Sequence, residues 1–263
     1  MTTTGSQCTA SSYTASAIIT STFSTIGQWD TNNSAGKGIA IENDSVVSDA
    51  TSAALVVGGG NSKQVVVRDQ TFDVNALAGL RFGSPGASLD TSSSSTFCRS
   101  TFVGSGHGVD SKGSLIIVDS TLEGYGSGGI GYNGLDVGAG SNTVIVGKST
   151  RIKAGDGGNV VWMRDGASID IHEGIFGDDE IYFSPLYVQG GTANIYGGEW
   201  KKQLYSVGGS GPNTINLYRD VNDSSLLCDG NAVPTVKIAS GGAGPNYLDC
   251  PQDYSVPTFP ECE

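Results

Sequence analysis

Short runs in which apolar and polar residues alternate recur along the chain at a nearly constant interval. The first set has one three-residue run in roughly every 25 residues. Its members are residues 55–57, 80–82, 109–111, 135–137, 161–163, 186–188 and 204–206. Because side chains alternate between the two sides of a strand, this pattern predicts short β-strands that each have one buried side.

A second set of alternating runs lies between the members of the first, at residues 65–67, 116–118, 144–146, 169–171, 193–195 and 215–217. Several of these are followed by a third short apolar piece, as at 119–122, 172–175 and 196–200. Such short strands cannot bury a side alone, but stacked coils spaced about 4.8 Å apart would share one core. An antiparallel sandwich would instead predict hairpins every 8–12 residues, roughly, and no constant phase. We therefore predict an all-β solenoid of about seven coils.

Glycine accounts for 40 of the 263 residues, and its freedom at positive φ suits the corners between strands. The segment 185–200, Pro-Leu-Tyr-Val-Gln-Gly-Gly-Thr-Ala-Asn-Ile-Tyr-Gly-Gly-Glu-Trp, resembles the right-handed parallel β-helix of the pectin-lyase-like superfamily. The resemblance covers roughly residues 38–220. It implies that the sheet of first strands is the side on which polysaccharides bind. It leaves the activity open, because that superfamily contains lyases, hydrolases, phage tail spikes, adhesins and inert surface proteins.

The repeat divides the chain into three parts. Residues 1–37 form an N-terminal segment and cap, with 15–26 as the capping piece, because a solenoid needs its ends covered. Residues 38–220 form the parallel β-helix. Residues 221–263 form a C-terminal cap and tail, in which five prolines are expected to exclude regular strands, at Pro234, Pro245, Pro251, Pro257 and Pro260.

Charge narrows the classes of partner. The chain has 26 acidic and 14 basic residues, a net charge of −12 and a pI near 4.4. Nucleic-acid binding and polybasic membrane anchoring both need clustered Lys and Arg, which the chain lacks, so we expect neither. No run approaches 18 consecutive apolar residues, so we expect no membrane insertion.

Five cysteines point to an oxidising compartment. Three of them lie in the irregular last part of the chain, which favours disulfide stapling over a metal site. The candidates for disulfides are Cys8, Cys228, Cys250 and Cys262, whereas Cys98, in a patterned segment, is expected to be a buried free thiol. Sequons at Asn32, Asn43 and Asn222 agree with secretion. The start of the chain lacks a signal peptide, so we expect a mature form of a secreted, extracellular protein.

The central residues of the first set share one outward-facing row, because each lies between two buried neighbours. In coil order the predicted row is Val56, Arg81, Asp110, Asp136, Trp162, Tyr187 and Tyr205. Adjacent coils would place Asp110 and Asp136 about 5 Å apart at the backbone. Such a pair calls for a cation, a shared proton or a neighbour such as Arg81. The aromatic members are either platforms for sugar rings or a ladder that stabilises the sheet.

Two catalytic schemes can be built on this row. A polygalacturonase-like hydrolase would pair aspartates as acid and base, and the family motifs resemble 106–108 (Gly-His-Gly) and 151–153 (Arg-Ile-Lys). Residues 151–153 fall on another face, however, and Asp178-Asp179 comes too late in the chain. A pectate-lyase-like site would hold Ca²⁺ with Asp110, Asp136 and Asp165, and would use Arg81, Lys112 or Arg164 as the base.

Three further patterns are explained without catalysis. Recurrent Ser-Thr pairs could suggest an ice-binding array, but they stop before residue 173 and suit turns better. Asn194 and Asn216 occupy equivalent positions and predict a structural ladder. His172 is expected to be a hydrogen-bonded corner residue.

The function predicted first is therefore a non-catalytic extracellular β-helix module. It would be a cell-surface, adhesive or filament component that holds a polysaccharide or cell-surface glycan on the first-strand face, with no required cofactor. Trp162, Tyr187, Tyr205, His107 and Arg164 are the candidate binding residues. The odd cysteine count also permits self-assembly or contact with other surface proteins. The alternative is a polysaccharide lyase or glycoside hydrolase that uses Asp110, Asp136 and Arg81 on the same face, with Ca²⁺ as the candidate ion.

Overall fold

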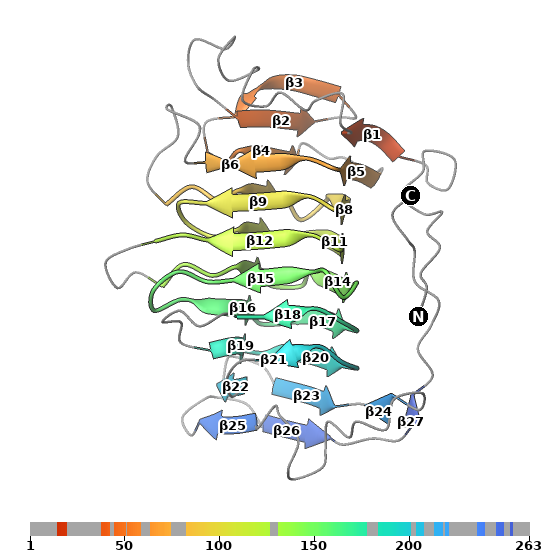
Figure 1. Ribbon diagram of the computed structural model, residues 1–263, viewed down its shortest axis with the longest axis vertical. Coiled ribbons are helices and arrows are strands. Elements are labelled where there is room, and N and C mark those ends of the chain that lie inside the picture. The colour runs from red at the N-terminus through yellow and green to blue at the C-terminus, as the bar shows by residue number, and fades with distance from the viewer. Residues whose placement is uncertain are drawn as a thin grey trace.

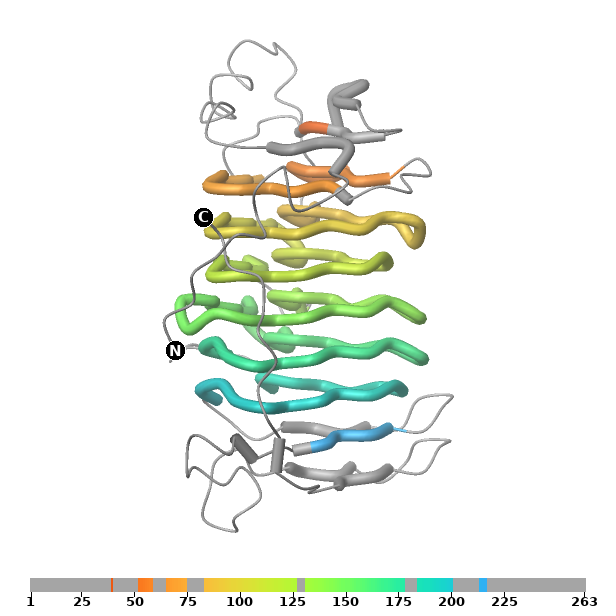
Figure 2. Tube along the Cα trace, turned by 90° about the vertical axis from the view of Figure 1, so that its right-hand side faces the viewer, coloured from red at the N-terminus to blue at the C-terminus, as the bar shows by residue number. Residues whose placement is uncertain are grey.

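The computed structural model describes fourteen stretches of the chain, and all structural statements below concern them. They are residues 15–19, 38–42, 45–50, 52–58, 64–74, 83–126, 131–177, 184–200, 204–207, 213–217, 219–220, 236–239, 246–249 and 253–254. Short strands from these stretches stack into layers along the long axis of the molecule (Figures 1 and 2). Within them, no helix is long and apolar enough to cross a membrane.

Strands that contain all of the first predicted set except residues 80–82 lie in one sheet, called here the first sheet. Its parallel strands are β2 (Gly38–Glu42), β4 (Leu55–Gly58), β7 (Ala87–Leu89), β10 (Val109–Ser111), β13 (Leu135–Val137), β16 (Asn159–Met163), β19 (Ser184–Val188), β22 (Leu204–Val207) and β25 (Val236–Ala239). The strand β3 (Ser45–Ala50) pairs with β2 in the antiparallel direction and ends the sheet. This antiparallel strand occupies the edge that another chain could otherwise extend.

The second predicted set forms the second sheet, which has nine strands in parallel. They are β1 (Ala15–Ile19), β5 (Gln64–Arg68), β8 (Ser94–Cys98), β11 (Ser114–Val118), β14 (Asn142–Val146), β17 (Ala167–Ile171), β20 (Gly191–Ile195), β23 (Asn213–Leu217) and β26 (Asn246–Asp249). The strand β1 comes from the predicted capping piece and pairs with β5.

The third short pieces form the third sheet: β6 (Thr71–Asp73), β9 (Thr101–Gly104), β12 (Thr121–Gly124), β15 (Arg151–Lys153), β18 (Ile175–Phe176) and β21 (Glu199–Trp200). From β4 to β21 each successive strand triplet therefore contributes one strand to each sheet. This arrangement is that of an all-β parallel solenoid, as the periodicity predicts. The interior is apolar, and stacked rings such as Phe72 on Phe102, with centroids 5.2 Å apart, continue from coil to coil.

Two expectations about where strands occur are wrong. The strand of the first sheet between β4 and β10 is β7, which pairs with both of them, and not the predicted run 80–82, which lies outside the described residues. Arg81 itself lies outside the described residues, and Ser88 occupies the row position expected for it. The chain also does not lose regular strands after residue 221. The strands β25, β26 and β27 (Asp253–Tyr254) pair in parallel with β22, β23 and β24 (Arg219–Asp220). Prolines precede or separate these strands instead of interrupting them.

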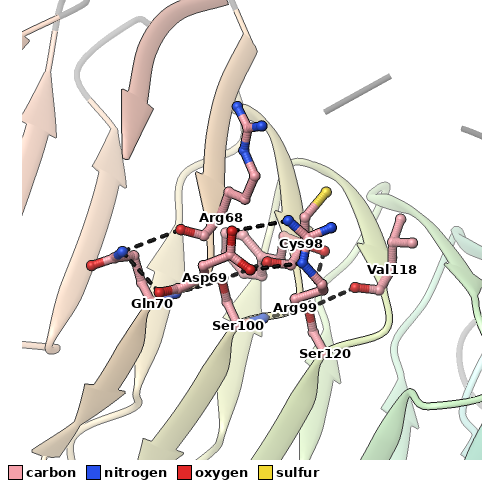
Figure 3. A network of polar contacts seen from close by, with 9 residues as sticks. Arg68, Asp69, Gln70, Cys98, Arg99, Ser100, Val118 and Ser120 are labelled. Atoms are coloured by element: carbon pink, nitrogen blue, oxygen red, sulfur yellow. Dashed lines mark hydrogen bonds and ion pairs between the residues drawn. The ribbon is translucent and has the colours of Figure 1, made fainter. Parts of the chain in front are cut away.

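The corner between the second and third sheets carries side chains at positive φ. Asp69, Arg99 and Asp119 have φ values of 56°, 45° and 47°, and Gly147 follows them with φ of 90°. Arg99 donates two hydrogen bonds to the carboxylate of Asp69, at 2.7 and 2.9 Å (Figure 3). Inside the corner, the Ser120 hydroxyl accepts from the Ser100 amide at 3.1 Å. The Ser120 hydroxyl thus satisfies a turn amide that the strand ladders leave unpaired, as the Ser100 hydroxyl does for the backbone amide of Gln70.

Cys98 ends β8 and is fully buried. It is disulfide-bonded, so the expectation of a free thiol there is wrong. Cys8, Cys228, Cys250 and Cys262 lie outside the described residues.

Candidate functional site

The outer row of the first sheet contains most of the predicted site residues, because its register aligns them coil by coil. Asp110 pairs with Ser88 on one side and with Asp136 on the other. Trp162 follows Asp136, and Tyr187 and Tyr205 follow Trp162. The side chain of Tyr205 lies outside the described set. Apart from Arg81, the predicted order of the row agrees with this register.

Asp136 is the centre of a charged cluster. Its side chain is 1% exposed. Arg164 Nε donates to Asp136 Oδ1 at 2.8 Å, and a terminal guanidinium nitrogen donates to Oδ2 at 2.6 Å. Asn133 Nδ2 lies 3.4 Å from Oδ2, and His107 Nε2 lies 3.5 Å from it. Hydrogen bonds to Asp136 in turn raise the pKa of Arg164, which keeps the guanidinium charged. Both oxygens of Asp136 are thus engaged by the protein, and this geometry gives the residue a structural role.

Residues just before the strands hold this cluster in place. The backbone amide of Asn133 donates a hydrogen bond to His107 Nδ1, and the backbone amide of Asn159 donates one to Asn133 Oδ1, both at 2.9 Å. Because Nδ1 is an acceptor, the neutral His107 ring carries its proton on Nε2, which faces Asp136. Burial lowers the pKa of His107, and the attraction of Asp136 only partly offsets it. His107 therefore links two coils instead of presenting a free imidazole.

Asp110 differs from its neighbour in the pair. Its side chain is 26% exposed, and the ammonium of Lys112 lies 3.7 Å from its Oδ2. Burial raises the pKa of Asp110, Lys112 lowers it, and Asp136 raises it further. Of the two carboxylates, Asp110 is the one that solvent reaches. A half-buried carboxyl with a raised pKa is suited to donating a hydrogen bond or a proton.

The aromatic residues continue the row beyond the charged cluster. The Arg164 guanidinium carbon lies 4.5 Å from the centre of the Trp162 ring. Trp162 Nε1 donates to Gln189 Oε1 at 3.2 Å, and the Tyr187 ring meets the Trp162 ring edge-on at 6.0 Å. Burial raises the pKa of Tyr187. Trp162 is half-buried on the outer side of the sheet, so it is a fixed platform on the surface and not a core residue.

The predicted calcium site does not gain support from this geometry. No group of three or more His, Cys, Asp or Glu side chains gathers in the part of the chain that the structure describes. Both carboxylate oxygens of Asp136 already accept hydrogen bonds from Arg164. Asp165 lies in the turn after β16, where its carboxylate would collide with a β-carbon added at Gly190 in the next coil. The three predicted ligands are therefore not brought together.

Other sequence predictions fall on other faces. Residues 151–153 form β15 of the third sheet, away from His107, as expected. Asp178 and Asp179 lie outside the described residues. The asparagine ladder is confirmed: Asn216 Nδ2 donates to Asn194 Oδ1, and Asn194 Nδ2 donates to Asp170 Oδ1, both at 2.7 Å. His172 is buried and stacks on Tyr196 with ring centres 4.4 Å apart.

Sequence reasoning missed Ser88, Asn133 and Gln189. A signal for Ser88 was present, because β10 is followed by β11 after only two residues, whereas the run 80–82 lies eleven residues before β8. Asn133 could have been found as the residue before Gly134, in the position that His107 holds before Gly108. Gln189 gives no such signal, since its role depends on the rotamer of Trp162.

Comparisons with known proteins do not add a family. No protein-family model, curated protein or solved structure matches this chain.

Proposed function

We propose that this protein is an extracellular, non-catalytic module that holds polysaccharide along the outer row of the first sheet, on a right-handed β-helix of the pectin-lyase-like kind. The observation that carries the proposal is the fixed Trp162 ring, held by Arg164, Gln189 and Tyr187 on the outside of a rigid sheet. A preoriented aromatic ring binds a sugar face at a low entropic cost. Asp110 on the same row supplies a hydrogen-bond partner for sugar hydroxyls.

The charges of the row favour a neutral or weakly charged glycan. Asp136 and Arg164 neutralise each other, and Asp110 is faced by Lys112. The chain as a whole carries a charge of −12, which repels a polyanion such as pectate. Secretion is supported by the cysteine count and by the disulfide at Cys98, since such bonds persist in oxidising compartments.

Retention in glycan-containing gels tests the proposal. A panel of neutral and uronic polysaccharides should include at least one that slows the wild-type protein. Trp162→Ala should then lose most of the retardation, because the ring is the platform. Tyr125→Ala is the matched control, since Tyr125 is 59% exposed and lies off the row. Equal mobility of the wild-type protein across the whole panel, with and without Ca²⁺, would exclude the proposal.

One observation favours the alternative of a polysaccharide-cleaving enzyme, namely the raised pKa of Asp110. A hydrolase also needs a second carboxylate, and both oxygens of Asp136 are already engaged. A lyase needs a base, and Arg164 stays charged beside Asp136. Incubation of the wild-type protein and Asp110→Asn with the same panel, with Ca²⁺ present, decides the matter. New reducing ends or unsaturated products made by the wild-type protein alone would establish the enzyme.

A further inference from the structure

In two successive coils, the residue that directly follows the strand of the first sheet reaches back to the outer row of the preceding coil. Gln189 follows β19, and its Oε1 accepts a hydrogen bond from Trp162 Nε1 at 3.2 Å. Arg164 follows β16 in the same way, and its guanidinium donates to both carboxylate oxygens of Asp136. Each of these row residues therefore has its partner in the coil that comes next.

Gly138 holds the same position for Asp110. It follows β13 directly, and β10, β13 and β16 pair in parallel without a register shift. Its amide donates to a carbonyl of the preceding coil at 2.7 Å, as the amide of Arg164 does one coil later at 2.9 Å. Because glycine has no side chain, the chain supplies no counterpart of the Arg164 guanidinium at this place.

Asp110 is consequently more open than its neighbour in the row. Its side chain is 26% exposed, against 1% for Asp136. The ammonium of Lys112 lies 3.7 Å from Asp110 Oδ2, farther than the 2.6 and 2.8 Å of the bonds that Arg164 makes to Asp136. Lys112 is itself 56% exposed, and such ion pairs are weak. Burial raises the pKa of Asp110, as expected for a partly desolvated carboxylate whose charge is incompletely compensated.

The place above Gly138 is bordered by a side chain that can move. A β-carbon built on Gly138 would lie 2.9 Å from Cγ of Lys112 and 3.2 Å from the carbonyl oxygen of Ser111. The stem of Lys112 therefore runs beside Gly138, and it belongs to an exposed, flexible side chain. A small cationic group can occupy this place once the stem moves aside. An ammonium group there has N–H donors for both oxygens of Asp110.

The charge of the chain and the rest of the row narrow the class of ligand. A net charge of −12 attracts a cationic polymer and repels an anionic one. Trp162 lies two strand spacings, about 10 Å, from Asp110 on the same row, so a polymer can contact both. A polysaccharide with amino sugars offers an ammonium group to the first and a ring face to the second. A lysine-containing peptide offers the same charge but loses more conformational entropy when it is ordered along the row.

We propose that the outer row of the first sheet binds a polysaccharide that contains amino sugars, and that an ammonium group of this glycan occupies the place above Gly138 against Asp110, as Arg164 does against Asp136. The inference rests on the proposed function, since it names the class of glycan that the row holds. It also gives the weak charge of that glycan a sign, which is positive. N-acetylation of the amine removes the charge and should weaken binding.

Affinity gels that contain two matched polymers test the proposal on the full-length protein. One gel holds a glucosamine polymer, and the other holds the same polymer after N-acetylation. The wild-type protein should bind the free-amine polymer about tenfold more tightly. Asp110→Asn should bind both polymers equally. Glu199→Gln removes the same charge from an exposed position of β21 in the third sheet, and it should keep the preference. An unchanged preference in Asp110→Asn would mean that net charge alone attracts the polymer, and would overturn the proposal.

Two further variants change the place above Gly138 and leave Asp110 intact. Gly138→Arg supplies a guanidinium from the chain itself and should abolish the preference for the free amine. Gly138 has no positive φ, so a side chain fits there once Lys112 shifts. Lys112→Met removes the competing ammonium and should strengthen the preference. If neither variant alters the preference, the ammonium group does not occupy this place.

The same gels separate failure of this inference from failure of the proposed function. If the wild-type protein is slowed by neutral glycans but shows no preference for the free amine, the amino-sugar inference falls and the proposed function stands. If no polymer in the panel slows it, both fall. Polylysine that displaces the protein from the glucosamine gel at an equal or lower concentration of charged groups would identify a general cation site and overturn the choice of a sugar.

Discussion

The outer sides of the first and second sheets are built from the same kind of parallel ladder but carry opposite chemistry. On the first sheet the central row is charged and aromatic, with Asp110 and Trp162 partly open to solvent. On the outer side of the second sheet, Cys98, Val118 and Val146 are almost completely buried. The row that contains Ile116 and Val144 continues beyond β14 with polar residues, namely Asp170, Asn194 and Asn216. One sheet therefore presents an open surface suited to a ligand, whereas the other carries a buried apolar cluster on its outer side.

The largest effect is expected where the first sheet buries a charge. Arg164→Met removes the partner of Asp136, which is 1% exposed, and should lower the free energy of unfolding by about 3 kcal/mol. Lys112→Met, which breaks the more exposed pair with Asp110, should cost less than about 0.5 kcal/mol. Urea unfolding of the two variants measures both. Equal losses would mean that the cluster around Asp136 is no more buried than the rest of the row.

A pH effect of similar size is expected at His172, which directly follows β17 of the second sheet. Burial lowers the pKa of His172 to about 4, from about 6.5 in the unfolded chain. The unfolded state therefore binds the proton first as pH falls, and stability drops between pH 6.5 and about 4, by up to about 3 kcal/mol. His172→Phe keeps a ring against Tyr196 and should remove this slope from a urea-unfolding series. An unchanged slope would assign the pH dependence to other groups.

A smaller difference in stability is expected between substitutions on the outer sides of the two sheets. Val118→Ala deletes buried methyl groups from the outer side of the second sheet and should cost about 1–2 kcal/mol. Ser88→Ala, at a half-buried position of the first-sheet row, should lie within about 0.5 kcal/mol of the wild-type protein. Thermal unfolding of both variants provides the test, and a Val118→Ala variant as stable as the wild-type protein would mean that Val118 is open to water.

The smallest loss of stability is expected in the asparagine ladder of the second sheet. Asn194→Ala breaks two hydrogen bonds of the ladder, to Asp170 and from Asn216, both at a half-buried position. The loss should be about 1 kcal/mol, because each such bond contributes modestly in net terms. Ser168→Ala, which removes a single exposed bond to Asn142, is the control. Equal results would show that the ladder adds nothing beyond ordinary surface bonds.

Periodicity predicted the solenoid, most strand positions and the order of the outer row. It failed at 80–82, where the more apolar run Leu-Arg-Phe looked stronger than Ala-Ser-Leu at 87–89, although hydrogen bonding selects the latter. It also failed after residue 221, because prolines can precede strands without breaking them. The contrast between Asp110 and Asp136 could not be read from the sequence, since it depends on Arg164 reaching back from the following coil.

The corner that precedes the first sheet limits which amino-acid substitutions the molecule tolerates. Added β-carbons at Gly86, Gly108 and Gly134 would lie 2.8, 2.5 and 2.4 Å from backbone oxygens of the next coil. The opposite corner accommodates Asp69, Arg99 and Asp119 with full side chains. A library of substitutions should therefore be nearly empty along the glycine corner and should accept Asp, Asn and Gly, but few β-branched residues, along the charged one. In engineering this scaffold, side chains can be exchanged at the corner between the second and third sheets, whereas the corner before the first sheet must keep its glycines.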